Sequence, residues 1–158
     1  MGSDPFLAPE PTPRLGPEHA HMDVFVGEWN SDGWTADSSP TGRVRVTHHH
    51  TYEWLPGRFF LVHRWDGRIG DAPNRGIEII GHDPLNDTYA SHFFDSGGWA
   101  RHYQAKVRDN VWTFAGERER ATFVFGDDGN DIIVRWEQTH DGSNWVPLCE
   151  VRATRSLR

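Results

Sequence analysis

From Glu28 onward, apolar and polar residues alternate with a period of two, and clusters of turn residues interrupt the alternation. This pattern predicts β-strands at 28–35, 43–54, 58–66, 75–82, 87–95, 99–107, 111–117, 119–125, 131–139 and 144–155. The turns are short and rich in Gly, Asn, Asp and Pro, which is typical of antiparallel hairpins. Closing such a meander removes its free edges. We therefore predict an all-β, antiparallel up-and-down barrel of about ten strands. A two-sheet sandwich is the alternative.

The segment before the first strand has a different character. Residues 1–17 contain five of the ten prolines, a density that opposes both helix and sheet. We predict a disordered tail over 1–16 and a single domain over 17–158. Pro17 suits the first position of a helix, and Met22, Phe25 and Val26 share one helical face. A short helix over 17–26 is expected to cap one end of the barrel.

The alternation also predicts which residues face the barrel interior. In the second strand the even positions are apolar at both ends, so His48, His50, Tyr52 and Trp54 should point inward and His49 outward. By the same argument His63 and Trp65 of the third strand, and Trp136 and Gln138 of the ninth, face inward. The fifth, sixth and tenth strands fit either orientation, and we place His92, Phe94 and Tyr103 inside.

The predicted interior is therefore a mixture of large rings and hydrogen-bonding groups. A purely structural core favours aliphatic side chains, because a buried polar group without a partner costs free energy. An apolar cavity with a few polar contacts is typical of a small-molecule site. The predicted ligand-binding residues are His48, Tyr52, Trp54, Trp65, His92, Phe94, Tyr103, Trp136 and Gln138.

Composition narrows the classes of partner. The formal net charge of −7 argues against duplex nucleic acid and anionic membranes, which both require a basic surface. The chain has no run of 18 apolar residues and no visible secretory signal, so a cytoplasmic location is expected. A single cysteine, Cys149, excludes an internal disulfide and a thiolate zinc site. The expected partner is a small molecule, and homodimerisation is left open.

Three functions are compatible with this interior. The first is binding of an apolar, aromatic small molecule without a cofactor. The second is a cofactor-free isomerase, cyclase or dehydratase, with His50 or His63 as general base and Tyr52 as donor. The third is a metal site: His48 and His50 lie two apart on one strand face, and His63 would complete a three-histidine zinc site. Haem bound by an inward histidine is a variant of the third.

Nucleophilic catalysis has little support in the sequence. Cys149 lies between Leu148 and Glu150 with no histidine nearby in the sequence, and a buried free cysteine usually acts as a small apolar group. The orientation of the last strand is open. If Glu150 faces inward, it has a raised pKa or forms an ion pair with Arg152. Otherwise both residues are solvated cross-strand charges.

Several motifs carry a family resemblance. Gly27-Glu28-Trp29 after a short helix is similar to the opening of the first strand in calycins, the lipocalin and fatty-acid-binding barrels. Three segments resemble a bacterial family catalogued as domain of unknown function 1579. They are Pro17-Glu18-His19 leading to Trp29, Gly81-His82-Asp83-Pro84, and Asp141-Gly142-Ser143-Asn144-Trp145 with Glu150 and Thr154-Arg155. Together these segments span about residues 16–155.

The resemblance implies a lipocalin-like barrel with a helical plug, and no established activity. By analogy with calycins, it implies that Trp29 packs under an arginine of the last strand, either Arg152 or Arg155, in a cation–π contact. The related nitrobindin barrels hold haem through a histidine near the C-terminus, and no residue here matches it. The His48-His49-His50 run departs from the family pattern, which points to a specialised pocket.

Overall fold

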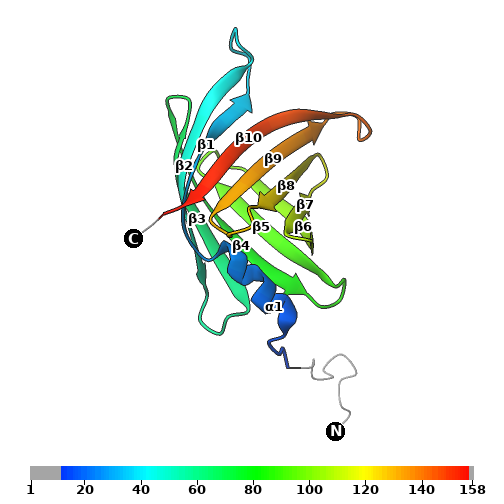
Figure 1. Ribbon diagram of the computed structural model, residues 1–158. Coiled ribbons are helices and arrows are strands. Elements are labelled where there is room, and N and C mark those ends of the chain that lie inside the picture. The colour runs from blue at the N-terminus through cyan, green and yellow to red at the C-terminus, as the bar shows by residue number, and fades with distance from the viewer. Residues whose placement is uncertain (1–11, 157–158) are drawn as a thin grey trace.

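Each β-strand pairs with its neighbours in the sequence, and the first strand also pairs with the last, so the sheet closes into a barrel (Figure 1). The structure is a computed structural model and describes residues 12–156. Its strands are β1 (Gly27–Ala36), β2 (Arg43–Trp54), β3 (Phe60–Ile69), β4 (Ala72–Asp83), β5 (Thr88–Asp95), β6 (Ala100–Arg108), β7 (Val111–Ala115), β8 (Glu119–Phe125), β9 (Asp131–Thr139) and β10 (Trp145–Arg155). The predicted ten-stranded antiparallel barrel is confirmed. Most of the predicted tail, residues 1–11, lies outside the described residues.

The strand bounds agree with the alternation except around the third turn. The predicted strands 58–66 and 75–82 leave a loop over 67–74, and this loop is wrong, because β3 continues to Ile69 and β4 already begins at Ala72. Asp66-Gly67, which has the composition of a turn, lies within β3. A Cβ atom on Gly67 would come within 2.0 Å of the Thr47 carbonyl oxygen on β2. Glycine is therefore required here for close approach of two strands, and not for a turn.

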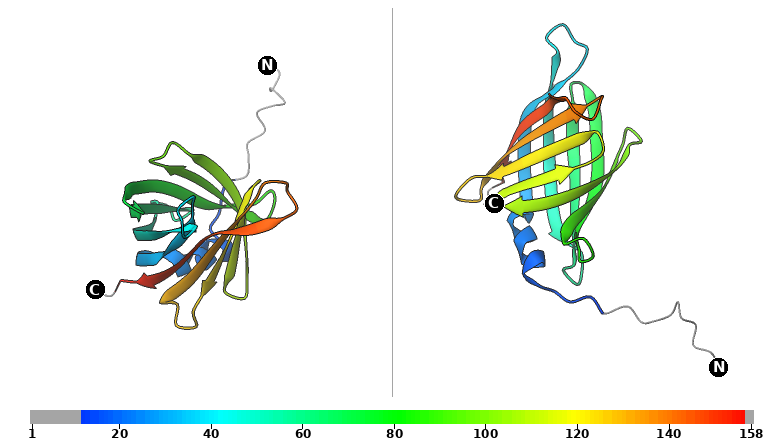
Figure 2. Two further views of the ribbon diagram at one scale, coloured as in Figure 1. Left: turned by 90° about the horizontal axis from the view of Figure 1, so that it is seen from above. Right: turned by 90° about the vertical axis from the view of Figure 1, so that its right-hand side faces the viewer.

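A short helical segment covers one end of the barrel (Figure 2, right). The α-helix α1 (Pro17–His21) tightens into the 3-10 turn η1 (Met22–Phe25), where the Val26 N–H donates to the Asp23 carbonyl at 3.1 Å. The predicted helix over 17–26 is thus present as two short pieces. Met22 and Phe25 are fully buried, so they anchor the segment in the barrel. No helix among residues 12–156 is long and apolar enough to cross a membrane.

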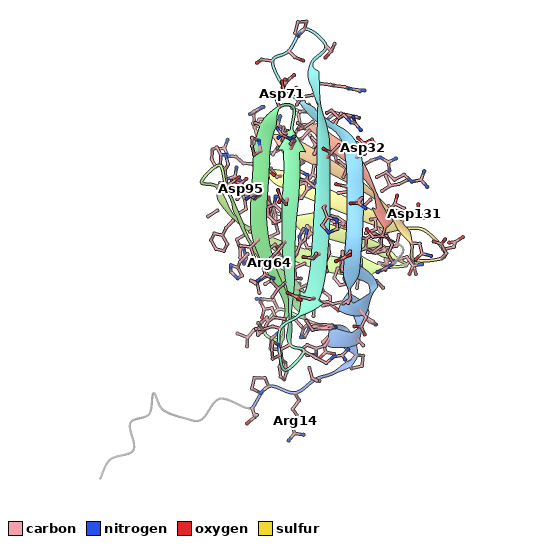
Figure 3. All side chains as sticks on the ribbon, turned by 90° about the vertical axis from the view of Figure 1, so that its left-hand side faces the viewer. Arg14, Asp32, Arg64, Asp71, Asp95 and Asp131 are labelled. Atoms are coloured by element: carbon pink, nitrogen blue, oxygen red, sulfur yellow. The ribbon has the colours of Figure 1, made fainter. Side chains whose placement is uncertain are left out.

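Aromatic rings fill the barrel end beneath this helix. The Phe25 ring lies 5.0 Å from Trp112, 5.2 Å from Phe125 and 5.3 Å from Tyr52, measured between ring centroids. Such edge-to-face and offset contacts bury large surfaces and stabilise the packed end. The other end carries the turn at Asp71, whereas Arg14 precedes the helix at the packed end, as Figure 3 shows.

One arginine of β10 ties the packed end to the helix. The guanidinium of Arg155 lies 4.1 Å from the centre of the buried Trp29 ring and donates to the carbonyls of Val26 and Gly129. Trp29 Nε1 donates to the Phe25 carbonyl at 2.8 Å. Of the two arginines that the calycin analogy allowed, Arg155 makes the contact. Arg152 faces outward and pairs with Asp131 at 3.3 Å.

We expect Arg155→Ala to lower the free energy of unfolding by about 2–3 kcal/mol, because it removes charge-assisted hydrogen bonds and a cation–π contact together. The matched control is Arg152→Ala on the same strand, which removes an exposed ion pair and should cost less than about 1 kcal/mol. Urea denaturation of the two variants measures the difference. Equal losses would show that Arg155 does not anchor the helical segment.

Candidate functional site

Above the packed end, the barrel encloses a cavity of about 380 Å³ that extends toward the end opposite the helix. Apolar rings line much of it: Trp29, Tyr52, Trp65, Phe93, Trp99, Tyr103, Phe114, Phe123 and Trp136. The polar side chains of the lining are Ser31, Thr35, His48, His50, His63, Asn74, Glu78, Asp95, Arg101 and Glu119, and small and aliphatic side chains line the remainder. This combination of shape and lining is typical of small-molecule sites.

The structure brings together most of the residues that the alternation placed inside. The predicted site residues that line the cavity are His48, His50, Tyr52, His63, Trp65, Tyr103 and Trp136. The inward orientation of β2 is therefore confirmed. His49 is exposed on the outer face, as predicted, and hydrogen-bonds to Asn30.

Four other predicted residues do not line the cavity. The prediction that His92 and Phe94 face inward is wrong, because β5 presents Ser91 and Phe93 to the interior and leaves Phe94 50% exposed. Each face of β5 carries a ring, so alternation alone did not orient this strand. Trp54 lies below the cavity and donates to Asp23 at 2.8 Å, and Gln138 lies opposite Glu119 outside the lining.

A chain of hydrogen bonds crosses the polar wall of the cavity. Its central link joins His50 Nδ1 to His63 Nε2 at 2.9 Å. On one side His63 Nδ1 lies 2.9 Å from the Glu78 carboxylate, which also accepts from the Ser91 hydroxyl. On the other side His50 Nε2 lies 2.9 Å from Ser31 Oγ. We call these five residues, on five consecutive strands, the polar relay.

Strand register explains why these side chains meet. His63 and Glu78 are directly opposite on β3 and β4, so they project from the same face of the sheet. Ser31, Glu78 and Ser91 were not singled out from the sequence. For Glu78 a signal was present, because a single carboxylate occupies an inward position in the otherwise apolar run Ile77–Ile80. For the two serines, only the register reveals the contacts.

The relay has one consistent assignment of protons when Glu78 is ionised. The carboxylate accepts from His63 Nδ1–H, so His63 Nε2 is free to accept from His50 Nδ1–H. His50 Nε2 then accepts from the Ser31 hydroxyl. Burial and the nearby His63 hold the pKa of His50 well below its usual value, so His50 is neutral at pH 7.

A phenol ring covers the centre of the relay. Tyr52 stacks on His63 with ring centroids 3.9 Å apart and an interplanar angle of 5°. Burial and the nearby Glu78 raise the pKa of Tyr52 well above its usual value, so its hydroxyl keeps its proton. Tyr52 therefore contributes an aromatic ring with a protonated hydroxyl to the lining of the cavity.

A second polar cluster lies next to the relay, around Asn74. Its Oδ1 accepts from Trp65 Nε1 at 3.0 Å and lies 2.9 Å from His48 Nε2. Since this oxygen only accepts, His48 carries its proton on Nε2. Burial lowers the pKa of His48, which keeps the ring neutral at pH 7.

The three predicted zinc ligands are not arranged as a metal site. His48 is bonded to Asn74, and both ring nitrogens of His50 and His63 are engaged within the relay. Among residues 12–156 no group of three or more His, Cys, Asp or Glu side chains is arranged to hold a metal ion. These residues do not fit zinc as they stand, and the zinc and haem alternatives stay predictions from the sequence.

The last strand and the cavity mouth complete the site. Glu150 faces outward and pairs with Arg135 at 3.3 Å, so it is not an interior acid. Cys149 lines the cavity, and burial raises the pKa of its thiol to about 11, which makes it a weak nucleophile near pH 7. Near the mouth Arg101 stacks over Trp99 at 4.4 Å and lies 3.7 Å from Glu119.

One family model and several solved structures match this chain. A family model described as "Protein of unknown function (DUF1579)" matches residues 14–134. The crystal structure of Rv2717c from M. tuberculosis is similar, with a TM-score of 0.64 and 11% identity, covering 91% of this chain and 100% of that one. The S-type phycobiliprotein lyase CPES from Guillardia theta has a TM-score of 0.56 and 9% identity, covering 92% and 95%. Both likenesses concern the fold alone. A search of the curated proteins finds no match.

We expect acid to destabilise the protein through His50 and His48. Their pKa values are lowered in the folded state, so below the usual value of 6.5 the unfolded chain binds more protons. The free energy of unfolding should fall by up to about 1.4 kcal/mol per pH unit for each histidine, until the folded-state pKa is reached. Urea denaturation at pH 7 and pH 5 measures this loss.

The variant that isolates the effect is His50→Gln. It should lose less stability between pH 7 and pH 5 than the unmodified chain. The control is His140→Gln in the exposed turn after β9, which should keep the original pH dependence. An unchanged pH dependence in His50→Gln would mean that His50 is not held neutral by the fold.

Proposed function

This chain belongs to the DUF1579 family of proteins of unknown function, and from its cavity we propose that it binds a small aromatic molecule inside the barrel. The single observation that carries the proposal is the cavity of about 380 Å³ with its ring-lined wall. Protein interiors are close-packed, and voids much larger than a water molecule are uncommon. A space of this size among aromatic side chains suits a ligand of the size range found in small-molecule sites.

The polar groups indicate what else the ligand carries. One group of them lies around His50, His63 and Asn74, on β2, β3 and β4, whereas Phe114 and Phe123 line another part of the wall, on β7 and β8. A ligand with an apolar ring system and at least one hydrogen-bonding group matches this division. The relay then fixes the orientation of that group, and the rings supply most of the buried surface.

The comparisons support this proposal in a limited way. One structural neighbour is named as a phycobiliprotein lyase, so the same barrel architecture occurs in a protein with that name. The isomerase, cyclase or dehydratase considered from the sequence gains no observation that places it above binding.

Binding is testable with N-phenyl-1-naphthylamine, a neutral aromatic dye that fluoresces in apolar sites. We expect saturable binding, and Phe93→Ala should weaken it about tenfold, because one ring contact of roughly 1.4 kcal/mol is lost. Phe93 lines the cavity and stacks on Trp65 at 4.7 Å. The matched control is Phe94→Ala, one residue along the same strand on the outer face, which should leave the affinity unchanged.

An equal effect of the two variants would show that the dye binds outside the barrel. Absence of saturable binding to the unmodified chain would count against the cavity as an aromatic site. Thermal denaturation of both variants, measured in parallel, separates a lost contact from a loss of fold.

A further inference from the structure

One end of the polar relay is a hydroxyl group that lines the cavity. Ser31 lies on β1, is 5% exposed, and its Oγ lies 2.9 Å from His50 Nε2. His50 is in turn oriented by His63, and His63 by the Glu78 carboxylate, each through a hydrogen bond of 2.9 Å. A hydroxyl next to a base, with the base oriented by a further group, is the arrangement that activates a serine nucleophile.

We propose that Ser31 is the nucleophile of an acyl-transfer activity, with His50 as its general base, and that the substrates are esters of aromatic compounds. The proposal rests on the proposed function, because the aromatic part of the ester occupies the same ring-lined cavity. It adds to that function a reaction and a chemical class of substrate.

The proton assignment of the relay suits this role. His50 is neutral and directs the lone pair of Nε2 toward the Ser31 hydroxyl, as a general base must. When His50 takes the proton on Nε2, its Nδ1 proton can move to His63 Nε2. The positive charge then lies on His63, between the Glu78 carboxylate and the face of the Tyr52 ring. Both neighbours stabilise a cation at that position.

The reaction balances with water as the only co-reactant. Ser31 Oγ forms a bond to the ester carbonyl carbon while its proton passes to His50. The ester C–O bond then breaks, and the leaving alkoxide or phenolate takes the proton back from His50 Nε2. Water attacks the acyl group on Ser31 by the same steps, which releases a carboxylic acid and restores the hydroxyl.

The other candidate nucleophiles of the cavity region lack these features. Ser91 lies at the opposite end of the relay, is fully buried and does not line the cavity, so it cannot reach a cavity ligand. Cys149 lines the cavity, but burial raises the pKa of its thiol. Ser31 alone, among these three, combines access to the cavity with a neutral imidazole.

The position of Ser31 also sets the expected rate. It lies within β1, paired with His48 on one side and Ala153 on the other, so the backbone N–H groups around it serve the sheet. A backbone oxyanion hole at Ser31 is therefore not available. Since such donors usually supply a large share of the acceleration, we expect slow turnover, with activated aryl esters as the reactive substrates.

The test uses the full chain and 4-nitrophenyl acetate, with release of 4-nitrophenolate followed by absorbance and the protein followed by mass spectrometry and peptide mapping. We expect one acetyl group on Ser31 in the unmodified chain and in Ser143→Ala, a control in the exposed turn after β9, and none at position 31 in Ser31→Ala. His50→Gln should slow acetylation of Ser31 about 100-fold. Acetylation of Lys106, the only lysine of the chain, reports the chemical background and should be equal throughout.

Glu78 is a positioning residue in this scheme, and Glu78→Gln tests it. A glutamine amide can donate to His63 Nδ1, which reverses both imidazole tautomers and places a proton on His50 Nε2. We expect acetylation of Ser31 to fall at least tenfold, while nitrogen-15 NMR of the histidine rings shows His50 Nε2 newly protonated. A merely structural role of Glu78 would not produce this tautomer change.

The outcomes separate this inference from the proposed function, because dye binding is measured on the same samples. Retained binding of N-phenyl-1-naphthylamine with no acetyl group on Ser31 overturns the nucleophile and leaves the binding function standing. Equal acetylation rates in His50→Gln and the unmodified chain also overturn it. If the unmodified chain shows neither dye binding nor an acetyl group on Ser31, both proposals are overturned.

Discussion

The buried carboxylate of Glu78 organises the interior of this barrel. An ionised group in an apolar surrounding is tolerated only when hydrogen bonds replace its water, and two donors, Ser91 and His63, do so here. Once His63 is committed to Glu78, its second nitrogen must find a partner, and His50 supplies it. The second nitrogen of His50 also needs a partner, and Ser31 supplies it. The polar wall of the cavity is thus the consequence of solvating one acidic group without water.

The residues that stabilise the fold and the polar wall of the cavity lie at different positions along the barrel axis. At the helical end Phe25, Trp112 and Phe125 pack ring against ring, and Arg155 locks the helix over Trp29. Toward the other end, glycine in the strands leaves room for large side chains in the cavity wall. A Cβ atom on Gly76 would lie 1.9 Å from the Trp65 ring, so glycine allows Trp65 to lie flat across β4 and reach Asn74.

The sequence predicted those features that depend on one strand at a time. Alternation correctly oriented β2, because its even positions are apolar at both ends, and so placed His48, His50 and Tyr52 in the cavity. It failed for β5, where Phe93 and Phe94 offer a ring to each face. The relay lay beyond this method, since its contacts join five strands and exist only in one register. Two of its members, Ser31 and Ser91, are ordinary residues for a strand when each strand is considered alone, and Glu78 stands out only as a single carboxylate in an apolar run.

The placement of the relay argues that it serves more than stability. The packed end shows that this chain can fill a barrel with rings, and replacing buried charged networks by apolar groups is often neutral or stabilising in proteins. The relay nevertheless occupies the wall of the cavity, where a ligand would meet it. Its two ends also differ: Ser91 is sealed off, whereas Ser31 lines the cavity. The need for hydrogen-bond partners explains each link from Glu78 to His50, but it does not explain why the last partner is a hydroxyl that lines the cavity, and this position of Ser31 is the part that requires a functional explanation.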